Sequence, residues 1–211
     1  MTNKNDSRVT AKYTTSNIIL DGRLEEEIWN QTQVIRIDKS IKTGETISSL
    51  STEVRLLWSA DFLYISYVAP YRELVMFEPA IFEGKRVGLW ERDVVEVFIN
   101  SDSNKINHYS EYEVAPTGEK IDLMLDLPEK DFLWCSNFEA AVHLDTTAKL
   151  WTTKMRIPFS AFGVGKLSAG MCWRINFYRH AITERVFLGW QPTMNDSAHK
   201  PEHFGSLEFI Q

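Results

Sequence analysis

Two tryptophans stand beside polar residues in stretches that otherwise have the pattern of β-strands. Trp90 is followed directly by Glu91, and Trp190 lies between a glycine and a Gln-Pro pair. A strand that only fills a core does not need a tryptophan next to charged, glycine or proline residues. An exposed indole offers a flat face on which a sugar ring or another partly apolar ligand can stack. We therefore predict that Trp90 and Trp190 form a ligand-stacking pair, with packing of each ring against the core or a loop as the alternative.

A carboxylate interrupts one of the most hydrophobic strand patterns in the chain. Residues 93–99 alternate between two faces, and Glu96 shares its face with Val94 and Phe98. A charged carboxylate among apolar neighbours costs several kcal/mol unless it is paired. We expect Glu96 to meet an arginine, a metal or a ligand hydroxyl. Arg179 is the first candidate partner and Arg174 the second, and a purely structural ion pair is the alternative.

The stretch 171–180 carries a row of polar side chains opposite an apolar face. Arg174, Asn176 and Tyr178 recur at period two, so they lie on one face of the predicted strand. A row of hydrogen-bonding groups with an aromatic ring suits a polyhydroxylated ligand, and an ordinary solvated sheet face is the alternative. Arg179 falls instead with the core residues of this strand, which are Met171, Trp173, Ile175 and Phe177.

A third polar and aromatic row lies on the stretch 107–115. Tyr109, Glu111 and Glu113 alternate with His108, Ser110 and Tyr112. Glu111 is therefore a further candidate for ligand binding. Glu111 or Glu113 could also pair with Glu96 in acid/base catalysis, which for glycoside hydrolysis requires two carboxyls about 5 to 10 Å apart.

The order of short alternating segments predicts the fold that must position these residues. Period-two patterns begin at Val54 and continue in the stretches 62–68, 93–100, 107–115, 119–126, 137–143, 149–157, 171–180, 185–190 and 205–210. Many short strands without alternating helices indicate an all-β, antiparallel β-sandwich of immunoglobulin or jelly-roll-like type. One short N-terminal helix is expected over 21–29, with Asp21 as its cap. We expect a flexible lead-in over 1–17 and a single domain over 18–211.

Composition limits the classes of partner. The 211 residues carry a formal net charge of −6, with 44% hydrophobic and 12% aromatic residues. This favours a globular protein and argues against nucleic acid and against anionic membrane surfaces as partners, because both attract basic proteins. No apolar run approaches the roughly 20 residues of a membrane span. The polar start predicts a cytoplasmic protein, or a secreted one whose signal has been removed. Cys135 and Cys172 have no metal-type spacing and are expected to be free thiols.

The ordered set of motifs resembles the family 9 carbohydrate-binding modules, in their family 9-like branch. The resemblance rests on LDG at 20–22 with EIW at 27–29, VRLLW at 54–58, Trp90 with DVVEVFI at 93–99, YEVAPTG at 112–118, MRIPFSAFG at 155–163, WRINFYR at 173–179, WQP at 190–192 and HFGSL at 203–207. It extends from about residue 18 to the end of the chain.

The resemblance implies a site and a ligand. It implies that Trp90 and Trp190 sandwich a terminal sugar, and that Glu96 with Asn176 or Arg179 binds its hydroxyls. It also implies a mono- or oligosaccharide partner, a tie to carbohydrate catabolism and structural calcium, although no Asp-rich loop of calcium spacing stands out. No catalytic residue and no other cofactor are assigned. The two alternatives are a glycoside hydrolase-like enzyme using Glu96 and a second carboxylate, and a haem-binding sandwich with His180, Met194 or Met124 as axial ligands.

Overall fold

The computed structural model describes residues 7–211, and within them the chain is almost entirely β-structure. The strands are β1 (Arg8–Tyr13), β2 (Ile35–Ile37), β3 (Lys39–Ser40), β4 (Thr52–Trp58), β5 (Phe62–Pro70), β6 (Val94–Asn100), β7 (His108–Val114), β8 (Lys120–Asp126), β9 (Glu129–Asp131), β10 (Glu139–Asp145), β11 (Leu150–Pro158), β12 (Cys172–Ala181), β13 (Val186–Gly189) and β14 (Gly205–Ile210). The all-β prediction is confirmed, and each predicted strand has its counterpart.

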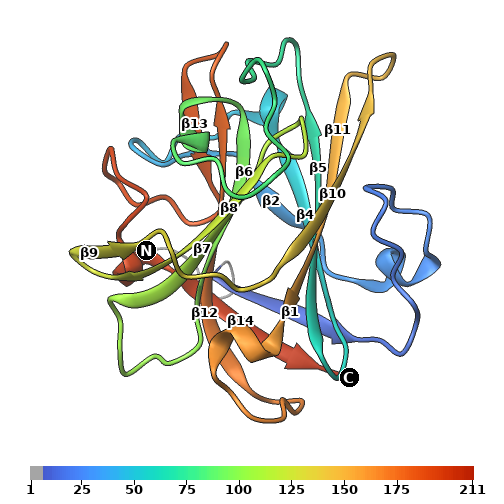
Figure 1. The fold of residues 1–211 in the computed structure, drawn as a ribbon, viewed down its shortest axis with the longest axis vertical. Helices are drawn as coiled ribbons and strands as arrows, with labels where there is room; N and C mark the ends of the chain where they lie inside the picture. Colours follow the sequence, from blue (N-terminus) through green and yellow to red (C-terminus); the bar gives the residue numbers. More distant parts are fainter. Residues whose placement is uncertain (1–6) are drawn as a thin grey trace.

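The strands form one continuous sheet that folds over on itself (Figure 1). Its order is β10-β11-β5-β4-β1-β14-β12-β6-β7-β8-β9, with β2 beside β4, and with β13 beside β12 and β3. The half with β4, β5 and β11 packs against the half with β6, β7 and β12 around a shared core. The sandwich is therefore made from two halves of one curled sheet.

The pairing is mixed rather than purely antiparallel, because β1 runs parallel to both of its neighbours, β14 and β4. Residues 8–13 belong to the stretch for which the sequence predicted a lead-in. Val9 and Ala11 of this strand are buried in the main core, so the segment joins the two halves of the sheet. Residues 1–6 of the predicted lead-in lie outside the described residues.

The predicted N-terminal helix is wrong, because residues 21–26 are not helical and only a 3-10 turn, η1 (Glu27–Gln31), follows. Gly22 has φ +77° and lies against the backbone of β10, which breaks a helix at its start. The acidic residues serve another purpose. Lys154, 1% exposed on β11, donates to both carboxylate oxygens of Glu26 at 2.9 and 2.7 Å and to Asp21 at 3.2 Å.

The main core confirms the predicted inward faces. Trp151, Met155, Trp173 and Phe177 are all buried in it, together with the apolar residues of β4 and β5. A second cluster lies on the other face of β6, β7 and β12 and includes Phe98, Tyr109 and Tyr178. Strand alternation explains the division, because Val95, Val97 and Ile99 turn to the main core and their neighbours on β6 turn away.

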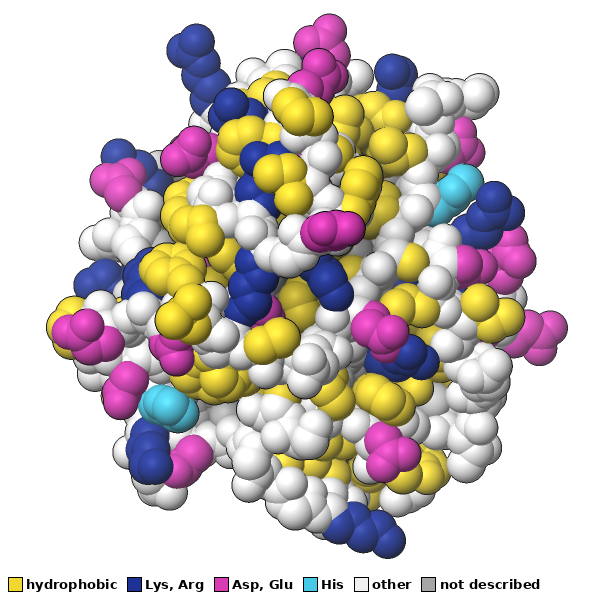
Figure 2. Space-filling view, in the orientation of Figure 1, with side chains coloured by type: hydrophobic (Ala, Val, Ile, Leu, Met, Phe, Trp, Pro, Cys, Tyr) yellow, Lys and Arg dark blue, Asp and Glu magenta, His cyan; other side chains and the backbone are white. Residues whose placement is uncertain are grey.

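The surface is of mixed character. On the face shown in Figure 2, Lys and Arg side chains lie singly among acidic and hydrophobic ones rather than as a continuous basic area. Cys135 and Cys172 are exposed free thiols, as predicted. Within residues 7–211, no helix combines the length and the hydrophobicity that a membrane span requires.

Candidate functional site

The site begins with three glutamates on the outer face of the β6–β7 pair. Glu96 lies directly opposite Glu113, and Glu111 lies opposite Phe98 in the same register. All three side chains share the face that points away from the main core, and all are at most 4% exposed. The sequence predicted this face correctly for Glu96 and for the row of Glu111 and Glu113.

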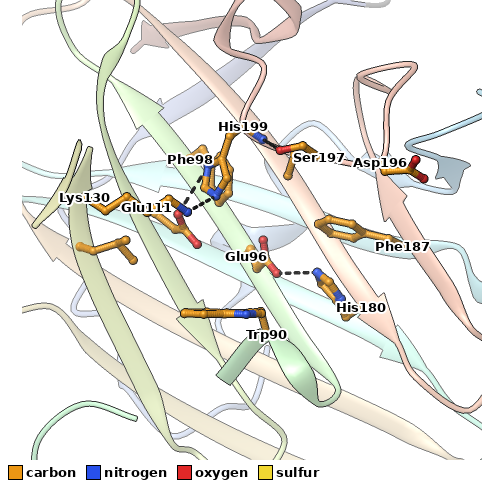
Figure 3. A pocket seen from close by; sticks show the side chains of 12 residues that line it. Trp90, Glu96, Phe98, Glu111, Lys130, His180, Phe187, Asp196, Ser197 and His199 are labelled. Carbon is orange, nitrogen blue, oxygen red and sulfur yellow. Dashed lines mark hydrogen bonds and ion pairs between the residues drawn. The ribbon is translucent and has the colours of Figure 1, made fainter. Parts of the chain in front are cut away.

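A cavity of about 280 Å³ lies over two of these carboxylates. Glu96, Phe98, Glu111 and Leu123 line it from β6, β7 and β8. Figure 3 shows Trp90 and Phe187 on different sides of Glu96. The remaining lining residues are Lys130 of β9, His180 of β12 and the segment Asp196, Ser197, Ala198 and His199. The cavity thus combines aromatic rings with carboxylates and nitrogen groups.

Trp90 takes its place from the 3-10 turn η3 (Leu89–Glu91), which directly precedes β6. Gly88, at φ +85°, allows the chain to enter this turn. Leu89 is fully buried and anchors the turn, while Trp90 is only partly buried and lies 6.3 Å, centroid to centroid, from Phe132. The indole is therefore held beside the cavity with part of its surface open.

The partner of Glu96 is a histidine rather than the predicted arginine. His180 Nε2 lies 3.1 Å from Glu96 Oε1, and the imidazole stacks on Phe187 with 3.6 Å between ring centroids (Figure 3). Tyr178 is opposite Glu96 in the β6–β12 register. His180 is two residues further on the same face, so alternation brings it to the carboxylate and sends Arg179 to the other side.

Arg179 does not belong to the cavity. Its guanidinium is 1% exposed in the core and donates to Leu50 O at 3.1 Å, Thr52 Oγ1 at 2.9 Å and Pro70 O at 2.6 Å. Burial lowers the pKa of Arg179 to about 10, and the charge of Asp93 opposes that shift. These hydrogen bonds hold the start of β4 and the end of β5 next to β12.

The predicted row of polar residues on β12 makes hydrogen bonds to the backbone of a later segment of the chain. Tyr178 donates to Ala198 O at 3.1 Å, Asn176 donates to Gln191 O at 2.9 Å, and Arg174 donates to Phe204 O at 2.9 Å. None of the three lines the cavity. They fix the segment 190–204 onto the sheet, and this segment supplies one side of the cavity. The face was predicted correctly, but these side chains bind the chain itself.

Trp190 does not form a pair with Trp90. It is 6% exposed, packs in the main core and lies 5.8 Å from Phe177 between ring centroids. The alternation of β13 explains this, because Leu188 and Trp190 turn inward while Phe187 turns to the cavity. Of the eight predicted residues, the structure therefore brings together Trp90, Glu96 and Glu111, and it does not bring the other five to the cavity.

Glu96, Glu111 and Glu113 form the floor of the site, and two of these three carboxyls have raised pKa values. Burial raises the pKa of Glu111 to about 7, and the charge of Glu96 acts in the same direction. Burial, followed by the charges of Glu96 and Glu111, raises the pKa of Glu113 well above its usual range. The two carboxyls interact with each other, and no other described residue donates to either oxygen of Glu113 or to Oε2 of Glu111. These two carboxyls therefore keep protons at pH values where exposed glutamates are ionised.

His199 closes the site opposite the glutamates. Its ring stacks on Phe98 at 5.3 Å, Nδ1 lies 2.9 Å from Tyr109 Oη and Nε2 lies 2.7 Å from Lys130 Nζ. Burial, and then the charge of Lys130, lowers the pKa of His199 to about 4. His199 is therefore a neutral ring at pH 7, and its Nε2 can accept a hydrogen bond from the ammonium of Lys130.

Several lining residues were not predicted as ligand contacts. Phe187 and His180 face each other in the β12–β13 register, and the period-two row of 174, 176 and 178 would have reached His180 if continued by one step. His199 and Ser197 lie in an irregular segment without periodicity, so the sequence carried no signal for them. The residues considered for haem do not share a cavity, because Met124 lines a different one and Met194 is exposed.

The structural calcium that the resemblance implies stays a prediction. Within residues 7–211, no group of three or more His, Cys, Asp or Glu side chains is arranged to hold a metal ion.

The fold and the cavity together define a class: a curled β-sandwich that carries one small aromatic and acidic pocket on the outer face of a half-sheet. Comparison with known families agrees with this class. The model of the family described as "Carbohydrate family 9 binding domain-like" matches residues 19–211. The chain belongs to that family.

Individual relatives extend the comparison. The chain is 24% identical over 208 residues to endo-1,4-beta-xylanase A of Thermotoga neapolitana, and 24% identical over 206 residues to the enzyme of the same name from Thermotoga maritima. Each match covers 96% of this chain but only 18% of the xylanase. The chain thus corresponds to one part of those much longer proteins.

Solved structures share the fold. A putative carbohydrate-binding protein from Bacteroides uniformis has a TM-score of 0.74 and 19% identity, with 96% of this chain and 99% of that chain covered. A family 9 module from Caldicellulosiruptor kristjanssonii, solved with cellotriose, has a TM-score of 0.69 and 16% identity, with 96% and 93% covered. The same module solved with glucose gives 0.68 and 16%, with 96% and 95% covered.

Proposed function

We propose that this protein binds a sugar, as a monosaccharide or as the end of an oligosaccharide, in the cavity between Trp90 and Phe187. The observation that carries the proposal is a half-open indole beside a buried carboxylate: Trp90 and Glu96 line the same cavity, and Glu96 is 2% exposed. A sugar ring has an apolar face that packs on an aromatic ring and hydroxyls that donate to carboxylates. Trp90 and Glu96 match these two features.

The size and lining of the cavity support one sugar unit. About 280 Å³ is just below the roughly 300–1,000 Å³ typical of pockets for drug-sized ligands. Phe187 takes the role of second aromatic wall that the sequence had given to Trp190. Glu96 and Glu111 supply acceptors for hydroxyl protons, while His180, Lys130 and His199 add nitrogen groups to the lining. A longer glycan would therefore leave its remaining units outside.

The relatives support the same class of ligand. The structures from Caldicellulosiruptor kristjanssonii are complexes with cellotriose and with glucose. The xylanases that contain a similar segment are named for the cleavage of a glycan. We place this chain in glycan breakdown as a binding module that holds the carbohydrate, with the bond cleavage done by another domain or protein.

The test is titration with a panel of glucose, xylose, cellobiose and cellotriose, followed by calorimetry and by tryptophan fluorescence. Trp90→Ala should weaken binding by roughly 5- to 30-fold, because a lost aromatic contact costs about 1–2 kcal/mol. The matched control is Phe82→Ala, since Phe82 is 73% exposed and does not line this cavity. No heat and no fluorescence change with any sugar at millimolar concentration would refute sugar binding. If Trp90→Ala binds the sugars with unchanged affinity, the ligand binds somewhere other than this cavity.

Acid/base catalysis is the second candidate, and one observation favours it. Glu111, with a pKa raised to about 7 by burial, lines the cavity together with Glu96, and a carboxyl that titrates near neutral pH suits general acid catalysis. The test is release of nitrophenol from a panel of nitrophenyl glycosides. Turnover that disappears in Glu111→Gln would establish an enzyme, and absence of turnover in a protein that binds the sugars would leave the binding module.

A further inference from the structure

The cavity has more buried acceptors than donors. Glu96 and Glu111 line the cavity, and Glu96 Oε1 and Glu111 Oε2 are buried without a well-aligned hydrogen bond: the nearest imidazole nitrogens are His180 Nε2, 3.1 Å from Glu96 Oε1, and His199 Nδ1, 4.0 Å from Glu111 Oε2. Glu113 lies directly opposite Glu96 on the adjacent strand, and its only hydrogen-bonding neighbour among the described side chains is the carboxyl of Glu111. Unpaired buried acceptors cost free energy, so a ligand that brings donors to this floor removes a penalty already present.

The charged groups around the floor do not balance the three glutamates. His180 on β12 is 3.1 Å from Glu96, and the nearest contact of His199 to Glu111 is 4.0 Å. Lys130 on β9 lies at the rim and directs its ammonium to His199 at 2.7 Å. The fourth acid, Asp196, is paired with Lys42 at 2.8 Å.

The floor therefore favours a positively charged donor over a neutral one. A neutral hydroxyl satisfies one acceptor and brings no charge that favours the ionised carboxylates. An ammonium group has three N–H donors and a positive charge, so it satisfies several acceptors and also stabilises the ionised form of the buried carboxyls. We propose that the cavity selects sugars that carry a free amino group, with the ammonium held between Glu96 and Glu111 while the ring packs on Trp90. This inference rests on the proposed function.

Binding of such a ligand has a measurable consequence. The pKa values of Glu111 and Glu113 are raised in the free protein, and an ammonium beside them lowers both. Protons held by the two carboxyls are then released when an amino sugar binds near neutral pH. A neutral sugar releases none, because it brings no charge to the floor.

The experiment compares glucosamine, glucose and N-acetylglucosamine on the full chain by calorimetry at pH 7. Glucosamine should bind at least about tenfold more tightly than glucose, because its contacts are charge-assisted. N-acetylglucosamine, which lacks the charge, should gain nothing over glucose. Repeating the titrations in phosphate and in HEPES, two buffers of different ionisation enthalpy, should reveal proton release with glucosamine alone.

Two variants sharpen the comparison. In Glu113→Gln the ratio of glucosamine to glucose affinity should fall severalfold, and proton release should decrease. Glu129→Gln makes the same substitution at an exposed position on β9 and should leave that ratio unchanged. Both affinities in the ratio are measured on the same variant, so a change in the stability of that variant does not by itself change the ratio.

The outcomes separate this inference from the proposed function. Glucose that binds as tightly as glucosamine, without proton release, overturns the preference for an amine and leaves sugar binding intact. No binding of any of the three sugars or of the wider panel overturns the proposed function, and this inference with it. Tighter binding of glucosamine, with proton release, supports both.

Discussion

The buried glutamates of the floor should reduce the stability of the free protein as the pH rises, and Glu111→Gln should restore it. Glu111 is 4% exposed, and burial raises its pKa from 4.5 to about 7. Between these two values the folded state holds a proton that the unfolded state has lost. The free energy of unfolding therefore falls as pH rises through this window, and the loss is complete above pH 7.

The magnitude follows from the same pKa. Each pKa unit corresponds to 1.36 kcal/mol, so the ionised form of Glu111 costs the fold about 3 kcal/mol above pH 7. Glutamine has the shape of the protonated acid and cannot ionise. We expect Glu111→Gln to be more stable than the parent protein by about 3 kcal/mol at pH 8 and equal to it near pH 4. Glu113 titrates in the same direction and adds to the slope of the parent protein.

The assay is urea denaturation at pH 4, 6 and 8, with both proteins measured under each condition. Glu129→Gln is the matched control, because it removes an equal charge from an exposed side chain on β9, and its effect should be small at every pH. A variant at position 111 that is equally or less stable than the parent protein at pH 8 would refute the reasoning. It would mean that the glutamate is paired or hydrated in the folded protein.

Three further substitutions test the packing, each by urea denaturation. Trp190→Ala should cost about 3–5 kcal/mol, because the ring fills the main core; a cost below about 1 kcal/mol would place the ring outside it. Gly205→Ala should cost roughly 1–3 kcal/mol, since its Cβ would overlap the Trp190 ring, and an unchanged midpoint would contradict that contact. Lys154→Met should cost up to about 3 kcal/mol, because it leaves Glu26 without its buried cation. In that last case a stabilised variant would show that methionine packing outweighs the ion pair.

The sequence by itself determined which residues face inward on the long strands. On β12 large apolar residues alternate with polar ones from Trp173 to Phe177, and on β6 Val95, Val97 and Ile99 recur at period two. A strand with one face in the main core has only one register that keeps those residues inside. The positions of Glu96, Glu111 and the core tryptophans Trp151 and Trp173 follow from that rule alone. The family resemblance followed from the order of these same strands.

The local sequence pattern predicted the wrong structure where a segment's contacts are made with residues far away in the sequence. Asp21 and the following glutamates have the composition of a helix start, yet Glu26 binds Lys154, 128 residues further along the chain. Residues 8–13 become a strand because β14 and β4 lie on either side of them. Burial of a cation and pairing with remote strands outweigh helix propensity, which is only a few tenths of a kcal/mol per residue.

The cavity itself was decided by the tertiary structure. Trp190 and Phe187 are three residues apart, and only the register of β13 against β12 determines which of them faces the glutamates. Arg179 and His180 are adjacent, and the register of β12 against β6 brings the histidine to Glu96. His199 enters from an irregular segment held in place by Tyr178, Asn176 and Arg174. Side-chain type could be recognised from the sequence, but which groups converge depends on strands and loops that meet only in the folded chain.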